Sequence, residues 1–74
     1  MIFEKIKGII VEQTGVDESV LTMESSFEDL GVDSLDLFQI IMMVEDEFGV
    51  EIKNAEAIKT IGDAVRFVEA KQEQ

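Results

Sequence analysis

The chain opens with a segment in which apolar residues recur every three or four positions. Apolar residues at this spacing fall on one side of a helix, where they can pack against a core. The residues that follow the spacing are Ile2, Phe3, Ile6, Ile9 and Ile10. We predict a helix over residues 2–14, ended by Gly15, because glycine readily takes the left-handed conformation that follows a helix.

Residues 16–33 lack this period and predict a loop. Apolar residues are spaced along it, and we expect them to hold the loop against the core. They are Val16, Val20, Leu21, Phe27 and Leu30. Ser25 with Glu28, and Ser26 with Asp29, resemble the capping pairs of a short helical turn.

Helical spacing returns over residues 34–48, and Gly49 follows as a natural end. Asp33 is suited to cap this second helix, and Asp36 in its first turn suits the positive end of the helix dipole. The stripe expected to face the core consists of Leu37, Ile40, Ile41, Val44 and Phe48.

Two further helices are predicted toward the C-terminal end. Asn54 could cap a very short one over residues 55–58. Thr60 and Asp63 resemble the start of a last helix that reaches about residue 71. Its apolar stripe consists of Ile61, Ala64, Val65 and Val68.

The second helix carries another apolar row, formed by Leu35, Phe38 and Met42. This row lies about 130° from the main stripe when each residue turns the helix by about 100°, and Glu45 and Asp46 stand at its far end. One interpretation is that neighbouring helices bury this row as well. The other is an exposed apolar strip rimmed by carboxylates, which is typical of a docking surface. Methionine suits a surface that accepts several partners, because its side chain is flexible.

Acidic residues dominate the chain. Seventeen acidic against six basic residues give a net charge of −11. This balance argues against binding to nucleic acid or to an anionic membrane surface, since both require basic residues. Between Gly8 and Ile52 there are twelve acidic residues and neither lysine nor arginine. Solubility alone would explain the negative sign of the charge. A stretch of this length with acidic residues and no basic one favours a protein partner with a basic patch.

The residue types also narrow the class of protein. Without cysteine or histidine we expect no disulfide and no metal site. The longest apolar run, residues 40–44, is too short to span a membrane, and no targeting segment is visible. We expect a single cytoplasmic domain over residues 1–74, and a monomer because nothing resembles a heptad seam.

A serine stands at the entrance of the second helix. Gly31 permits a tight turn, and Ser34 follows at or beside the first helical position. Backbone N–H groups are unpaired there and the helix dipole is positive, so a phosphate on Ser34 would be stabilised. The simpler interpretation is that Ser34, or Asp33 beside it, only caps the helix.

Residues 26–36, Ser-Phe-Glu-Asp-Leu-Gly-Val-Asp-Ser-Leu-Asp, resemble the signature of acyl carrier proteins. The resemblance extends to Glu-Gln-Thr-Gly-Val at the end of the first helix, to residues 45–52 and to residues 59–64. In that family the serine of Asp-Ser-Leu receives phosphopantetheine from coenzyme A through a phosphopantetheinyl transferase.

The resemblance implies roles for particular residues. Ser34 would carry covalent 4'-phosphopantetheine, with Asp33 and Leu35 as its motif neighbours. Acyl groups would travel on this arm as thioesters to fatty-acid, polyketide or other lipid biosynthetic enzymes with basic patches. The expected fold is an antiparallel bundle of three main helices plus one short helix. The residues that would meet those enzymes are Asp36, Phe38, Met42, Glu45 and Asp46.

The sequence differs from the family pattern in places. Gln39 stands where the family often has an acid, and Phe38 is bulkier than the usual residue beside the arm. Lys53-Asn54 replaces the usual Pro-Asp pair, and the stretch between Ile52 and Thr60 is about two residues shorter than is common. In the family this segment borders the cargo cavity. The sequence therefore leaves the identity of the cargo open, and it is compatible with a specialised carrier.

Other functions fit less well or stay as alternatives. An enzyme is not expected, since no histidine, cysteine or tyrosine is present to activate Ser34. A calcium loop aligned on Gly31 would place Leu30 at a ligand position, which it cannot fill. Two alternatives remain open. One is a non-carrier acidic interaction module, and the other is a D-alanyl or other aminoacyl carrier with the same arm chemistry.

Overall fold

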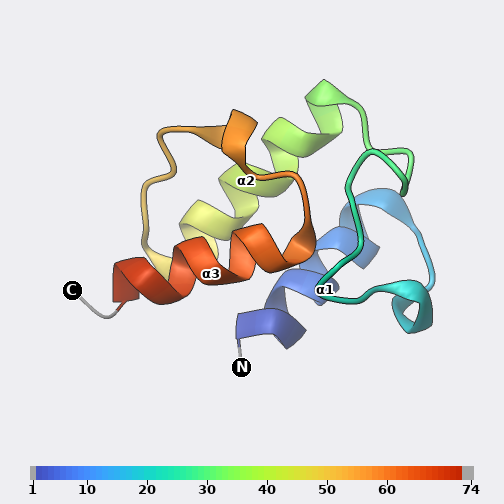
Figure 1. Cartoon of the computed structure of the whole chain (residues 1–74), viewed down its shortest axis with the longest axis horizontal. Coiled ribbons are helices and arrows are strands. Elements are labelled where there is room, and N and C mark those ends of the chain that lie inside the picture. The colour runs from blue at the N-terminus through green and yellow to red at the C-terminus, as the bar shows by residue number, and fades with distance from the viewer. Residues whose placement is uncertain (1, 73–74) are drawn as a thin grey trace.

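The computed structural model describes residues 2–72, which form helices joined by two long connections (Figure 1). The elements in chain order, with η for a short 3-10 helix, are α1 (Ile2–Thr14), η1 (Glu18–Val20), α2 (Ser34–Phe48), η2 (Ala55–Ala57) and α3 (Ile61–Gln72). The predicted all-α fold of three main helices plus a short one near residue 55 is confirmed. The turn at η1 was not predicted.

Helix α1 packs against both other main helices and runs in the opposite direction to them in Figure 1. Residues 15–33 join the end of α1 to the start of α2, which makes this pair antiparallel. Residues 49–60 return along the molecule, so α2 and α3 run in the same direction. This return connection carries η2 and lies beside α2, where it borders the site described below.

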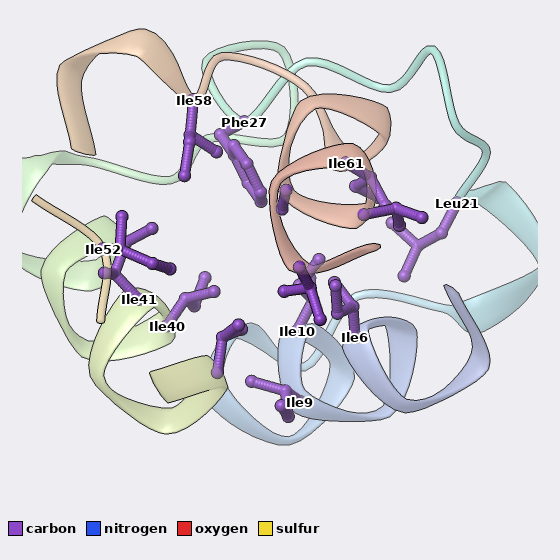
Figure 2. Close-up of a cluster of buried hydrophobic side chains, with 14 residues drawn as sticks. Ile6, Ile9, Ile10, Leu21, Phe27, Ile40, Ile41, Ile52, Ile58 and Ile61 are labelled. Atoms are coloured by element: carbon purple, nitrogen blue, oxygen red, sulfur yellow. The ribbon is translucent and has the colours of Figure 1, made fainter. Parts of the chain in front are cut away.

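The core is built mainly from branched aliphatic side chains (Figure 2). Each main helix contributes most of its predicted stripe, and four residues of the connections complete the cluster. The stripe residues Ile2, Phe3, Leu37 and Phe48 are only partly buried against it. The buried residues are Ile6, Ile9 and Ile10 of α1, Ile40, Ile41 and Val44 of α2, Ile61, Ala64, Val65 and Val68 of α3, and Leu21, Phe27, Ile52 and Ile58. Within residues 2–72 no polar or charged residue is buried, so apolar packing stabilises the interior. No helix in that range is long and apolar enough to cross a bilayer.

The connection from α1 to α2 meets the core at fewer points than predicted. Leu21 and Phe27 are buried, and Val16 and Leu30 are partly buried against the core. Val20 is 56% exposed, so the prediction that it anchors the loop was wrong. The reason is the tight turn of η1, which carries Val20 on its outer side and returns Leu21 to the core.

Two predicted caps also differ from the structure. Ser26 Oγ accepts a hydrogen bond from the Asp29 N–H as expected, but Ser25 Oγ accepts from the Thr22 N–H and does not cap the turn after it. Asn54 precedes η2 without a side-chain cap bond. The η2 turn is closed by its backbone instead, through the Ala57 N–H and the Asn54 carbonyl.

The start of α3 carries the predicted capping pair. Thr60 Oγ1 accepts a hydrogen bond from the Asp63 N–H at 3.1 Å, and Asp63 Oδ2 accepts from the N–H groups of Lys59 at 3.0 Å and Thr60 at 3.1 Å. Asp63 Oδ1 also pairs with the Arg66 guanidinium at 2.8 Å. These contacts satisfy backbone donors that the first helical turn leaves unpaired. The Lys59 N–H foremost, with Thr60 and Arg66, lowers the pKa of Asp63 below its usual 3.8.

This lowered pKa predicts how stability should change with pH. A carboxylate whose pKa is lower in the folded than in the unfolded chain stabilises the fold above its usual pKa, and that contribution is lost on acidification. We therefore expect Asp63→Asn to have a lower Tm than Glu69→Gln at pH 7, with the gap shrinking below pH 3.8, the usual value for aspartate. Glu69 is an exposed acid of the same helix and controls for the general loss of negative charge. Thermal melts from pH 7 to pH 3 test this, and a gap that does not depend on pH would contradict it.

Candidate functional site

Ser34 is the first residue of α2, and the residue before it caps the helix. The Asp33 Oδ1 accepts a hydrogen bond from the Asp36 N–H at 2.9 Å, and the Asp33 carbonyl accepts from the Leu37 N–H at 2.9 Å. The predicted cap at Asp33 is therefore confirmed. Because this carboxylate does the capping, the exposed Ser34 hydroxyl is not needed for it.

The turn before α2 fixes where Ser34 stands. Gly31 has φ of 79°, a left-handed conformation that suits glycine, and its N–H donates to the Glu28 carbonyl at 3.1 Å. The Val32 N–H then donates to the carbonyl of buried Phe27 at 3.0 Å. The turn is thus tied to the core two residues before Ser34, which holds the serine at the surface on a rigid base.

The second apolar row of α2 lies outside the core. Leu35 is 68% exposed, Phe38 59% and Met42 62%, whereas Ile40 and Ile41 between them are buried. We call Leu35, Phe38 and Met42 the α2 ridge. Of the two interpretations of this row, the structure supports the exposed strip. Isolated exposed apolar residues are ordinary, but three large ones on one helix face next to Ser34 form a patch.

The acids near this ridge differ in their surroundings. Asp46 is exposed, and Asp36 is half-buried in the first turn of α2. Glu45 is also half-buried, and its Oε2 accepts a hydrogen bond from the Ile52 N–H at 2.7 Å. Glu45 thereby holds the segment after α2 in place. Sequence reasoning missed this structural role because Ile52 lies beyond the end of α2, where helical spacing no longer relates one position to another.

Hollows follow α2 along the side that faces residues 52–59. The first, which we call the Ser34 hollow, has a volume of about 410 Å³ and is lined by Ser34, Leu37, Glu56, Ile58 and Lys59 among others. A smaller one of about 170 Å³ lies between Ser34, Phe38 and Ala55. A third, of about 410 Å³, continues past Phe38 to Glu45 and Ile52. Neighbouring hollows share lining residues, among them Ser34, Phe38 and Glu56, so the three lie next to one another along the helix, and we call them together the groove.

Four charged residues of this groove were not among the predicted site residues: Glu28, Lys53, Glu56 and Lys59. Glu56 lines all three hollows, and Lys59 lines the Ser34 hollow. Both come from the return connection, more than twenty positions after Ser34 in the sequence. The only signal for Lys59 in the sequence was that basic residues resume at Lys53 after a long stretch without any, and Glu56 had no such signal.

The α1 side of α2 has a different character. The Gln13 side-chain amide donates a hydrogen bond to the Gln39 side-chain oxygen, which joins the end of α1 to α2. A hollow of about 290 Å³ there is lined by these two residues with Met42, Met43 and Asp46. The uncharged Gln39 is thus used for an interhelical contact.

The local geometry suits a phosphate ester on the Ser34 oxygen. The N–H groups of Ser34 and Leu35 lie in the first turn of α2, where they have no partner within the helix. Together with the helix dipole they favour negative charge at this position. The exposed hydroxyl is accessible from outside, and the groove beside it offers room for the group that the phosphate would carry.

Comparison with protein-family models agrees with this geometry. A model described as "Phosphopantetheine attachment site" matches residues 4–68. The matched range contains the whole of α2, both long connections, and most of α1 and α3. The similarity therefore concerns the entire bundle and not only the stretch around Ser34.

Proposed function

Because this chain belongs to the acyl-carrier-like family of phosphopantetheine attachment site domains, we propose that Ser34 bears the arm and that acyl groups travel on it as thioesters. The family carries 4'-phosphopantetheine covalently, and its domains are generally non-catalytic shuttles that work with a transferase and biosynthetic enzymes. We propose the same for this chain: residues 1–74 act as one monomeric, cytoplasmic carrier domain that performs no catalysis.

The observation that carries the proposal is the exposed Ser34 hydroxyl at the start of α2, next to an Asp33 that already caps the helix. In the loading step this hydroxyl attacks the phosphorus that joins pantetheine to the nucleotide in coenzyme A. A Ser34 O–P bond forms, the bond to the nucleotide phosphate breaks, and adenosine 3',5'-bisphosphate leaves. The chain has no histidine or cysteine, so we assign the base that takes the hydroxyl proton to the transferase.

The arm supplies a thiol, which this cysteine-free chain lacks, as the group that bears the cargo. The chain's own residues provide the surroundings. Leu37 and Phe38 of α2 and Ala55 of η2 form apolar walls of the groove next to Ser34. A fatty acyl chain that folds back into this groove would be removed from water, which favours an acyl cargo.

We propose that partner enzymes dock on the α2 ridge and the acids around it. An apolar patch gives contact area, and its acidic rim gives attraction to a basic surface. The residues of this surface are Asp36, Phe38, Met42, Glu45 and Asp46. Asp46 is exposed and its charge is available to a partner, whereas the Glu45 carboxylate also holds the Ile52 N–H. The partners proposed are a phosphopantetheinyl transferase and fatty-acid or related lipid biosynthetic enzymes.

The competing cargo is an amino acid. The Glu56 carboxylate lines the same groove and is the feature that would suit the ammonium group of a D-alanyl or other aminoacyl cargo. An acyl chain and an aminoacyl group differ in how much apolar surface they can bury, and this difference can be measured on the loaded protein.

Loading with an octanoyl group should therefore stabilise the protein more than loading with an alanyl group. If the groove removes two methylenes of the octanoyl chain from water, the gain of about 0.8 kcal/mol for each should raise Tm by about 6–13 °C in a domain of this size. We would load the wild-type protein with octanoyl-, alanyl- or unacylated coenzyme A through a transferase, confirm each product by intact mass, and compare the melts. An equal Tm for the octanoyl and unacylated forms would contradict an acyl cargo sheltered in the groove, and a higher Tm for the alanyl form alone would favour the aminoacyl carrier.

A further inference from the structure

Lys59 is held in a fixed position beside the Ser34 hollow. Its N–H donates to Asp63 Oδ2 at 3.0 Å, and its carbonyl accepts from the Phe27 N–H at 3.0 Å. The next residue, Thr60, forms an antiparallel bridge with Ser26. The backbone of Lys59 is therefore fixed on both sides, and only its side chain is free to move.

A short path of backbone contacts connects Lys59 to the start of α2. Phe27 bonds to Lys59 through its N–H and accepts at its carbonyl from the Val32 N–H at 3.0 Å. Val32 is followed by Asp33, the cap of α2, and by Ser34. In Figure 2, Phe27 and Ile58 lie next to each other in the core, which brings the two chain segments together. Lys59 and Ser34 consequently line the same hollow although they come from different parts of the chain.

The charges of this hollow are unbalanced. The residues that line it include three acidic ones, Glu28, Asp33 and Glu56, and a single basic one, Lys59. A phosphodiester on Ser34 would add another negative charge to this group, and like charges at short range repel. Lys59 is the residue in the lining that can offset the added charge.

The ammonium group of Lys59 is also available. Lys5, Lys7, Lys53 and Arg66 each form an ion pair within the described part of the chain, and Lys71 lies over the Phe67 ring. Across residues 2–72, no carboxylate lies within ion-pair distance of the Lys59 Nζ. A contact with a phosphate would therefore not need to displace an existing ion pair.

We propose that the Lys59 ammonium group binds the phosphodiester by which the arm is joined to Ser34. This inference rests on the proposed function, since it requires the arm on Ser34. Lysine binds phosphate as a point charge with several N–H donors, and its flexible stem can reach over the hollow from a fixed backbone. Lys59 thereby holds the root of the arm at the mouth of the groove and reduces its repulsion by the surrounding carboxylates.

The test compares Lys59→Ala and Lys59→Arg with Lys53→Ala in the full-length protein. Lys53→Ala is the matched control, because it removes the same charge from an exposed lysine outside the Ser34 hollow. Each protein is prepared without and with the arm, and the extent of loading is read by intact mass. The two readouts on the loaded forms are the ³¹P chemical shift of the phosphodiester and the change in Tm on loading, at about 10 mM and about 1 M salt.

In the wild type, the ³¹P shift should differ from that of the urea-unfolded loaded protein and should move toward it at high salt, because salt screens the contact. In Lys59→Ala the shift should lie closer to the unfolded value than in the wild type and should change less with salt, because the ammonium contact is gone while the start of α2 is kept. The change in Tm on loading should be more negative in Lys59→Ala than in the wild type. Lys59→Arg should keep the wild-type pattern, and so should Lys53→Ala.

The outcomes separate the two proposals. If all proteins load fully but Lys59→Ala shows the wild-type ³¹P shift and the wild-type change in Tm, the assignment of Lys59 is overturned while the carrier function stands. If the wild type itself gains no arm, the proposed function fails and the assignment of Lys59 fails with it. Because the melts include the forms without the arm, any general loss of stability in Lys59→Ala is measured separately.

Discussion

Ser34→Ala should abolish loading with phosphopantetheine while leaving the fold nearly unchanged. The substitution removes the oxygen that would form the bond to phosphorus, so the expected loss of loading is complete. The helix keeps its cap, because the Asp33 carboxylate and not the Ser34 hydroxyl accepts from the Asp36 N–H. The residue is exposed, so the free energy of unfolding should change by no more than about 0.5 kcal/mol.

The measurement is the intact mass after incubation with coenzyme A and a phosphopantetheinyl transferase. The wild type should gain one phosphopantetheine and Ser34→Ala none. Ser19→Ala serves as control, since Ser19 is exposed in η1 and should be irrelevant to loading. A loaded Ser34→Ala protein would place the arm on another residue. A wild type that stays unloaded with several transferases would favour the acidic interaction module.

Gly62→Ala should destabilise the protein, although alanine is the better helix former. A Cβ built on Gly62 would lie 2.7 Å from the Met23 carbonyl oxygen, and the Gly62 N–H donates to that same oxygen at 2.7 Å. Because both the helix and the facing backbone must shift to admit the methyl group, we expect a loss of about 1–3 kcal/mol. In a domain of this size, each kcal/mol lowers Tm by about 4–8 °C.

Gly8→Ala is the matched control for this prediction. Gly8 lies inside α1, and a Cβ there meets no atom within 4 Å. Replacing Gly8 by alanine should therefore show only the higher helix propensity of alanine, and it should raise the free energy of unfolding by about 0.5–1 kcal/mol. Urea titrations of the two variants should shift the midpoint in opposite directions. Equal or parallel shifts would show that the contact between Gly62 and Met23 does not restrict the helix.

The helices could be predicted because their information is local. A helix repeats every few residues, so the spacing of apolar positions is sufficient to identify the buried faces of α1, α2 and α3. Caps are local as well, which is why Asp33 and the pair of Thr60 and Asp63 were found from sequence. An exposed α2 ridge was one of two interpretations of the second apolar row. The spacing of residues along a helix gives the angle between its faces, but it does not show which other segments cover each face.

The contacts between separate segments could not be predicted in this way. Glu45 was predicted as a docking residue, and the hydrogen bond that its carboxylate accepts from the Ile52 N–H was not foreseen. Val20 was expected to be buried, but the turn of η1 exposes it. The close approach of Gly62 to the Met23 carbonyl follows only from how α3 packs. Each depends on a neighbour distant in sequence.

The sequence by itself determined the three main helices, the caps at Asp33 and Thr60 and the serine at the start of α2, since each depends on neighbours within about one turn. The net negative charge followed from composition alone. Only the tertiary structure decided what surrounds that serine. The return of residues 49–60 along α2 creates the groove, and the bond between Phe27 and Lys59 places a lysine in the lining of the Ser34 hollow. These placements follow from how apolar faces pack in three dimensions, and a pattern along one helix does not specify which distant segment packs against it.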